Sequence, residues 1–205
     1  MSFSLYQLKP RFQQLLRPFL IRLAGAGVTP NQVTLAAMAL SLAYGIALAW
    51  APATTGLWLG LPLFLLLRMA LNALDGMLAT ATASQSALGA VLNEMCDQVA
   101  DAALYLPFAL AAGIAAPLAV LVVVTALLAE FAGVLAPSIG VPRRFDGPMG
   151  KSDRAFGFGV LALLIGFNAS AAWCNGVLAV ILALACVTVV NRLRRALRLC
   201  APATR

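Results

Sequence analysis

The chain contains no histidine, only four cysteines and few charged residues, and each of these shortages argues against a class of protein. The cysteines, which form no CxxC pair, are Cys96, Cys174, Cys186 and Cys200. Without histidine beside them they predict neither a zinc site nor a disulfide framework, and we interpret them as small apolar packing residues. Charged residues make up 10% of the 205 positions, whereas an ordinary soluble domain carries about 25%. The composition therefore argues against a soluble domain.

Long hydrophobic runs fill most of the sequence, of which 62% is hydrophobic, and short polar breaks separate them. A spanning helix needs about 20 residues. Six runs reach that length: 30–51, 56–80, 86–112, 117–138, 153–172 and 175–194. We predict an all-α integral membrane protein, in which residues 29–205 form one six-helix transmembrane domain and residues 1–28 an amphipathic juxtamembrane segment.

The juxtamembrane segment is expected to contain a helix that lies on the membrane surface. Residues 3–24 combine large apolar side chains with four basic ones, Lys9, Arg11, Arg17 and Arg22. This mixture is typical of an interfacial helix. Proline interrupts helical hydrogen bonding, so we expect Pro10 and Pro18 to break the helix into pieces.

The basic residues predict the orientation of the chain. Thirteen of the fourteen fall in the N-terminal segment, in the connection 139–154 or in the C-terminal tail, whereas the breaks near 52–55, 112–117 and 172–176 carry none. Basic residues accumulate on the cytoplasmic side of a membrane. Both termini are therefore predicted to be cytoplasmic. The remaining basic residue, Arg68, falls within the second predicted span.

Polar side chains lie inside the second and third predicted spans, where an ionisable group costs at least ~2.5 kcal/mol and so indicates function by default. Helical spacing places Asn72, Asp75, Gly76 and Ala79 on one face of the second helix. It places Gly89, Asn93, Asp97 and Asp101 on one face of the third. Small residues on these faces allow a close approach of helices or of a ligand.

These two helices are expected to form an antiparallel hairpin with its bend near Ala83. Counting outward from the bend brings four side chains into one cavity near the cytoplasmic end: Asn72, Asp75, Asn93 and Asp97. Oxygen ligands without His or Cys suit Mg²⁺ or Mn²⁺. One turn deeper, Arg68 and Asp101 could pair. The spacing alone leaves two alternatives open, a salt-bridge network that holds helices together and a proton relay in a transporter.

The same stretch carries a spaced motif, D-x2-D-G-x2-A-R-x8-G-x3-D-x3-D, at five of its eight fixed positions. The matching residues are Asp75, Gly76, Ala79, Gly89 and Asp97. With "TPNQVT" before the first span and "GPMGKSDR" before the fifth, the chain resembles a bacterial subgroup of the CDP-alcohol phosphotransferase family. Three positions depart from the motif: Asn72 and Asn93 replace Asp, and Thr80 replaces Arg.

The resemblance implies transfer of a phosphatidyl group from CDP-diacylglycerol to an alcohol, with release of CMP, in phospholipid biosynthesis. It implies that Asp97 is the general base and that Mg²⁺ or Mn²⁺ binds at Asp75, Asp97, Asn72 and Asn93. Gly76, Ala79 and Gly89 would leave room for the nucleotide. Asn31 and Thr34 either touch the nucleotide or only cap a helix.

A basic cluster, Arg143, Arg144, Lys151 and Arg154, precedes and begins the fifth predicted helix. It is either the basic signal of a cytoplasmic loop or a phosphate pocket, since a helix N-terminus favours anions. Given the resemblance, we favour a phosphorylated acceptor such as glycerol 3-phosphate, with inositol phosphate as the rival. Glu130 stands alone in the fourth predicted helix and either pairs with Arg68 or lines the acceptor cavity.

The resemblance further implies a multi-pass protein of the bacterial inner membrane, with the active site facing the cytoplasm. Its partners would be membrane lipids, the donor, the acceptor and a second copy in a homodimer, and no nucleic acid. The competing hypotheses are a catalytically weak or repurposed lipid-binding membrane protein and a small proton-coupled transporter. Against transport, the sequence contains neither an inverted repeat nor paired broken helices.

Overall fold

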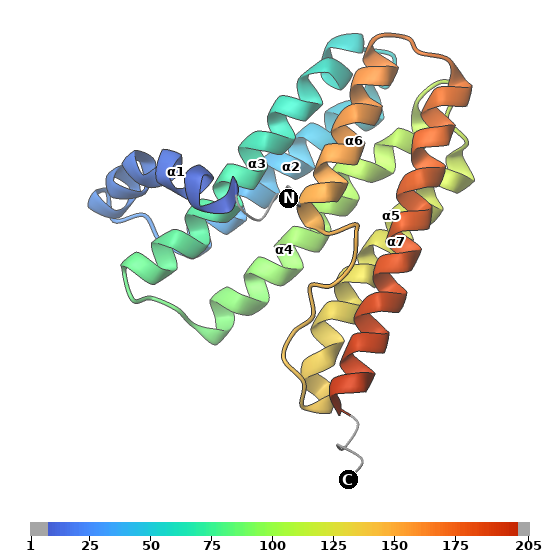
Figure 1. The fold of residues 1–205 in the computed structure, drawn as a ribbon. Coiled ribbons are helices and arrows are strands. Elements are labelled where there is room, and N and C mark those ends of the chain that lie inside the picture. The colour runs from blue at the N-terminus through green and yellow to red at the C-terminus, as the bar shows by residue number, and fades with distance from the viewer. Residues whose placement is uncertain (1–7, 201–205) are drawn as a thin grey trace. The chain divides into compact units, whose positions relative to one another are not determined.

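The computed structural model describes the backbone of residues 8–200 and the side chains of residues 12–200, and every regular element in this range is a helix (Figure 1). The α-helices are α1 (Leu8–Gly25), α2 (Pro30–Trp50), α3 (Thr55–Ala81), α4 (Ala87–Tyr105), α5 (Ala116–Leu135), α6 (Lys151–Gly166) and α7 (Ala171–Cys200). Short 3₁₀ helices, η2 (Leu106–Leu110) and η3 (Ala136–Ile139), follow α4 and α5. The predicted all-α class is confirmed.

Helices α2 to α7 occupy the six predicted positions. By length and composition, four helical stretches could cross a membrane: Pro30–Trp50, Thr55–Ala81, Ala116–Ile139 and Ala171–Cys200. Helix α4 has 19 residues and contains three acidic side chains, and α6 has only 16 residues. Six membrane spans therefore stay a prediction, although the six helices are present.

The predicted break at Pro18 is wrong, because α1 runs through it without interruption. Pro18 removes one backbone hydrogen bond, but packing of the same helix offsets that loss. Leu16 is buried in a cluster with Val33 of α2 and with Leu74 and Leu78 of α3. Pro10 falls in the first turn, where backbone N–H groups have no helical partner. Residues 3–7 of the predicted surface helix lie outside the described residues.

The described chain divides into two compact units. The first comprises the residues up to Ala43 together with Leu66–Ala100, and its core is the cluster around Leu16. The second comprises Tyr44–Leu65 and the residues from Asp101 onward. In it, α5 packs along α7 (Figure 1), and stacked aromatic rings fill the core. The signature residues belong to the first unit and the basic cluster to the second.

The aromatic core of the second unit is built around Phe158 of α6. Its ring stacks on Tyr105 at a centroid distance of 3.9 Å and meets Phe108 at 5.1 Å. Trp58 of α3 packs edge-on against Phe108 at 4.8 Å. All four rings are at most 1% exposed, so they fix α6 on its neighbours within this unit.

Candidate functional site

The hairpin of α3 and α4 carries the signature residues, and Asp97 is the point at which its two helices are tied together. The Asn72 Nδ2 atom donates to Asp97 Oδ1 at 3.1 Å. The Arg68 Nη2 atom donates to the Asp97 backbone carbonyl at 3.0 Å and lies 3.6 Å from Oδ1. Asn72 and Asp97, two of the four predicted site residues, are thus in direct contact.

Asp75 lies on the same face of α3, about one turn closer to the hairpin loop than Asn72. It is 3% exposed. The Thr34 hydroxyl of α2 donates to Asp75 Oδ2 at 2.9 Å, which holds the carboxylate in one orientation. Thr34 was predicted either to touch a nucleotide or to cap a helix, and in the structure it contacts a signature aspartate.

Asn93 lies one turn before Asp97 on α4 and about opposite Asp75 across the hairpin, since the Asn72–Asp97 contact sets the register of the two helices. Its Oδ1 atom is buried without a hydrogen-bond partner among the described residues. Such an oxygen normally meets a donor or a cation. A carbonyl-type oxygen beside aspartates suits a hard divalent cation.

The residues present therefore fit a divalent cation by the chemistry of their donor atoms. Carboxylate oxygens come from Asp75 and Asp97, and carboxamide oxygens from Asn72 and Asn93. A group of three or more His, Cys, Asp or Glu side chains placed to hold a metal does not occur between residues 8 and 200. Any cation held here would consequently depend on the carboxamides.

The small signature residues differ in the space around them. A Cβ atom at Gly76 would meet no heavy atom of the described residues within 4 Å. A Cβ at Gly89 would lie 3.1 Å from the Oδ1 atom of Asn31. Ala79 is half-buried, and Thr80, which stands in place of the motif's arginine, is exposed and donates its hydroxyl to the Gly76 carbonyl at 3.0 Å. Gly76 thus leaves open space beside Asp75.

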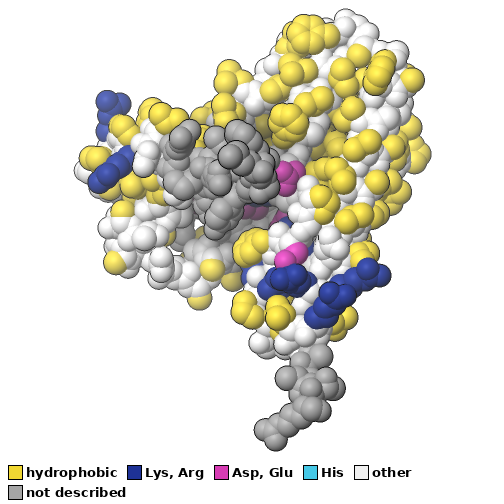
Figure 2. Space-filling view, viewed as in Figure 1, with side chains coloured by type: hydrophobic (Ala, Val, Ile, Leu, Met, Phe, Trp, Pro, Cys, Tyr) yellow, Lys and Arg dark blue, Asp and Glu magenta, His cyan; other side chains and the backbone are white. Residues whose placement is uncertain are grey.

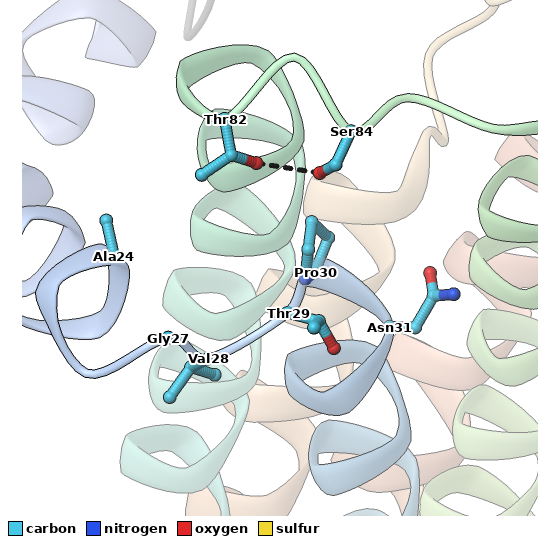
Figure 3. Close-up of a pocket in the computed structure, with 8 residues that line it drawn as sticks. All are labelled: Ala24, Gly27, Val28, Thr29, Pro30, Asn31, Thr82 and Ser84. Atoms are coloured by element: carbon cyan, nitrogen blue, oxygen red, sulfur yellow. Dashed lines mark hydrogen bonds between the residues drawn. The ribbon is translucent and has the colours of Figure 1, made fainter.

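A cavity of about 420 Å³ opens in the first unit between the start of α2 and the loop after α3 (Figure 3). It is lined by Ala24, Gly27, Val28, Thr29, Pro30, Asn31, Thr82 and Ser84. The hydroxyls of Thr82 and Ser84 are hydrogen-bonded to one another at 2.7 Å. Its volume falls within the usual range for small-molecule sites. Asn31, one of the predicted nucleotide residues, is part of its wall.

The basic cluster in the second unit contains a buried arginine. Arg154 is 1% exposed. Its Nη1 atom donates to Glu130 Oε1 at 2.8 Å, and its Nη2 atom donates to Asp101 Oδ2 at 3.0 Å. Arg192 Nη1 lies 3.2 Å from Glu130 Oε2. Arg154, which was predicted to bind an acceptor phosphate, is thus held between two carboxylates of its own chain.

The other predicted phosphate ligands are closer to the surface. Arg143 lies 3.6 Å from Glu130 Oε2 and stacks over Phe145. Arg144 makes two hydrogen bonds to Asp146, at 2.7 and 2.9 Å. Lys151 begins α6. The backbone N–H of Gly150 at this helix start donates to the Asp153 carboxylate at 3.0 Å. Figure 2 shows Lys and Arg side chains gathered toward the C-terminal end of the chain, with hydrophobic side chains over much of the viewed face.

Sequence reasoning missed two partners in this cluster, Arg192 and Asp146. Arg192 was assigned only to the basic tail, yet it is 2% exposed and donates to the backbone carbonyls of Ala129 and Asp146. A usable signal existed, because Glu130 is the one acidic residue of α5 and a charge at such a depth needs partners.

The chain is 50% identical over 162 residues to the inner membrane protein YnbA of Escherichia coli (strain K12), which covers 79% of this chain and 80% of YnbA. No protein-family model matches. Among solved structures, the Mycobacterium tuberculosis phosphatidylinositol phosphate synthase (PgsA1) with CDP-DAG bound matches with a TM-score of 0.77 at 19% identity, covering 89% of this chain and 94% of that chain.

A second structure of that synthase, in complex with manganese and citrate, matches with a TM-score of 0.76 at 20% identity and covers 88% of each chain. The fold of this chain is therefore that of a CDP-alcohol phosphotransferase. The resemblance indicated by the spaced motif is confirmed.

Proposed function

This chain belongs to the same family as the inner membrane protein YnbA and has the CDP-alcohol phosphotransferase fold, and we propose that it transfers a phosphatidyl group from CDP-diacylglycerol to an alcohol. The observation that carries the proposal is the hairpin itself. Asn72 contacts Asp97, Asp75 is buried and oriented by Thr34, and open space lies beside Gly76. One solved structure of the synthase with this fold contains CDP-DAG and another contains manganese, which supports the donor and a divalent cation.

The proposed reaction needs a general base and a bound divalent cation from the hairpin. Asp97 would accept the proton of the alcohol hydroxyl, whose oxygen then forms a bond to the phosphorus that bears the diacylglycerol. The bond from that phosphorus to the CMP oxygen breaks, and CMP leaves. A base placed against the attacking hydroxyl contributes about 10²–10⁴-fold. A divalent cation among the oxygens of Asn72, Asp75, Asn93 and Asp97, either Mg²⁺ or Mn²⁺, would neutralise the charge of the diphosphate.

The cavity at the start of α2 is the proposed place for the nucleotide. Its wall offers the side chains of Thr29, Asn31, Thr82 and Ser84 for hydrogen bonding. Asn31 also adjoins Gly89, so that the cavity wall connects to the signature face of α4. Gly76, Ala79 and Gly89 are the proposed close-approach positions for the donor, because larger side chains there would occupy its space.

The acceptor proposal rests on the basic cluster. A phosphorylated alcohol such as glycerol 3-phosphate would be met by the half-exposed Arg143 and Arg144 and by Lys151 at the start of α6, where a helix N-terminus favours an anion. Arg154 lies behind them between Glu130 and Asp101 and would stabilise their arrangement. Inositol phosphate carries the same charged group and is the rival acceptor.

The protein is proposed to work in the bacterial inner membrane as a multi-pass protein, with the active site facing the cytoplasm. Four helices long and apolar enough to cross a membrane support this, as does the relative YnbA, an inner membrane protein. The second candidate function is a lipid-binding protein without turnover. It is favoured by Asn72, Asn93 and Thr80, which remove charges that the motif would supply. A homodimer remains a prediction from the resemblance.

CMP release by the purified protein in detergent tests the function. CDP-diacylglycerol is supplied with glycerol 3-phosphate, inositol phosphate or an unphosphorylated alcohol, in the presence of Mg²⁺, Mn²⁺ or EDTA. We expect release that requires the metal, and a loss of at least 10²-fold in Asp97→Asn. Glu94→Gln is the matched control, because Glu94 lies on α4 outside the signature face. Binding of CDP-diacylglycerol without any CMP release would favour the lipid-binding protein.

A further inference from the structure

Arg68 is a cation within the signature face, and the spaced motif does not account for it. It lies on α3 one turn from Asn72, and its side chain is 4% exposed. The guanidinium contacts Asp97 twice, at the backbone carbonyl and near Oδ1. A buried positive charge needs a negative partner, and Asp97 supplies one.

Asn72 and Arg68 approach the same oxygen of the Asp97 side chain. Asn72 donates an N–H to Oδ1 at 3.1 Å, and Arg68 Nη2 lies 3.6 Å from the same atom. A carboxylate oxygen that accepts an N–H bond beside a guanidinium is a weakened ligand for a dication, because the guanidinium charge repels the ion. Asn72, in turn, directs its amide nitrogen toward Asp97.

The charge of the signature face also argues against two bound divalent ions. An arrangement of aspartates at positions 72, 75, 93 and 97 would carry four negative charges, whereas this chain has two carboxylates and one guanidinium there. Two divalent ions held about 4 Å apart repel strongly and need anionic ligands around both. Two carboxylates and one guanidinium leave a net charge of −1, which is too small to hold two dications close together.

We infer that Arg68 is a resident cation that takes the place of a second metal ion, so that the chain binds one divalent cation, through Asp75 and Asn93. Asn93 offers a buried Oδ1 atom without a hydrogen-bond partner among residues 12–200, and Asp75 is held by Thr34. Arg68 and Asn72 keep Asp97 outside the coordination shell, in position to accept a proton. The inference rests on the proposed function and narrows its metal-binding set to two side chains.

Binding of Mn²⁺ tests the inference without reference to activity. The full-length protein in detergent micelles is titrated with Mn²⁺, and the free ion is measured by its electron paramagnetic resonance signal. We expect one Mn²⁺ per chain. Two ions per chain would overturn the inference and leave phosphatidyl transfer intact, whereas no bound ion would overturn both the inference and the metal-dependent function.

Variants separate the two aspartates by the same measurement. Asp75→Asn is expected to weaken Mn²⁺ binding at least tenfold. Asp97→Asn is expected to change the affinity less than threefold, although it loses activity. A loss of Mn²⁺ affinity in Asp97→Asn as large as that in Asp75→Asn would show that Asp97 is a direct ligand and would refute the inference.

Arg68 itself is tested with a charge-removing and a charge-conserving variant. Arg68→Gln is expected to bind a second Mn²⁺ or to raise the affinity of the first at least tenfold, since Asp97 and its charge become accessible. Arg68→Lys should stay at one ion with the original affinity. An Arg68→Gln variant that folds and binds Mn²⁺ as the wild type does would count against the inference. If that variant does not fold, the wild-type stoichiometry and Asp97→Asn still decide.

Discussion

The Glu130 carboxylate in the second unit contacts three arginine side chains. Its carboxylate receives Arg154 at 2.8 Å, Arg192 at 3.2 Å and Arg143 at 3.6 Å, and the residue is 5% exposed. Arg154 and Arg192 are 1% and 2% exposed. Without Glu130, Arg154 would keep Asp101 as a carboxylate partner, whereas Arg192 would keep hydrogen bonds to backbone carbonyls, so this residue should matter more to stability than a surface ion pair.

Glu130→Ala is expected to destabilise the protein by about 3–5 kcal/mol, the usual cost of removing one partner of a buried ion pair. Thermal unfolding in detergent, followed by tryptophan fluorescence, measures the change. The matched control is Asp146→Asn, because Asp146 also pairs with two arginines, Arg144 and Arg195, but its side chain is 28% exposed. Equal shifts of the unfolding temperature in the two variants would show that burial around Glu130 contributes nothing.

Substitution of Gly76 tests donor binding without disturbing the fold. A methyl group there meets no heavy atom of the described residues within 4 Å, and alanine favours a helix over glycine by about 1 kcal/mol. Gly76→Ala should therefore unfold at an unchanged or higher temperature, yet bind CDP-diacylglycerol about tenfold more weakly because the methyl group occupies donor space. Calorimetric titration measures the affinity, with Gly176→Ala on α7 as control. Wild-type affinity in Gly76→Ala would place the donor elsewhere.

At the residue scale, the sequence predicted which side chains share a face but not all of their partners. Helical spacing placed Asn72 near Asp97, and the structure has them hydrogen-bonded. The contacts of Arg68 with Asp97 and of Arg154 with Asp101 were not predicted, and the pair of Arg68 and Asp101 stays a prediction. Helical spacing predicts which residues share a face of one helix, but it does not predict the register between two helices. Arg154, which donates to Asp101, is 53 residues away from it, a separation that no local pattern encodes.

At the scale of helices, apolar runs predicted where each element lies, because burial of a hydrophobic stretch sets its length. The ends were less predictable. The third run was expected to remain helical to residue 112, but α4 ends at Tyr105 and a 3₁₀ helix follows. Pro107, at the start of that 3₁₀ helix, lacks the N–H that a continued α-helix requires. Pro18 has the same defect within α1, where packing around Leu16 outweighs it.

Close contacts between helices depend on single glycines, and Gly45 of α2 is the strongest case. A Cβ at this position would overlap the backbone carbonyl of Ala103 in α4, and backbone atoms cannot move aside as a flexible side chain can. Gly45→Ala should therefore lower the unfolding temperature, by a free energy on the order of 1–3 kcal/mol. Gly176→Ala is the matched control, because its Cβ would meet no described heavy atom within 4 Å. A Gly45→Ala variant as stable as Gly176→Ala would contradict this contact.

At the scale of the whole molecule, the distribution of basic residues predicts the topology. The connection between α5 and α6 and the last turns of α7 carry arginines, whereas the short loop between α2 and α3, "APAT", carries no charge. Because basic residues favour the cytoplasmic side, the C-terminal end of α7 should face the cytoplasm and the α2–α3 loop the opposite side. Composition supplies this asymmetry, while the number of spans depends on α4 and α6, whose polar residues weaken the apolar signal.

The four cysteines make this topology measurable in the native chain. Cys96 and Cys174 are buried, Cys186 lies midway along α7 where lipid would surround it, and Cys200 is exposed at the end of the helix. A membrane-impermeant maleimide should therefore label Cys200 in inverted membrane vesicles and not in intact spheroplasts, because the reagent needs both an exposed thiol and access from the same side. Cys200→Ser should remove the labelling.

A cysteine on the opposite side completes the test. Thr54→Cys, placed in Cys200→Ser, lies in the loop between α2 and α3 and is exposed. It should be labelled in spheroplasts and not in inverted vesicles. If Cys200 and Thr54→Cys are labelled from the same side, the chain crosses the membrane an even number of times between them. Together with α2 this gives an odd number of spans, which would refute an even number of spans with cytoplasmic termini. Labelling from opposite sides requires an odd number of crossings between positions 54 and 200, which is met both by α3, α5 and α7 alone and by all five helices from α3 to α7.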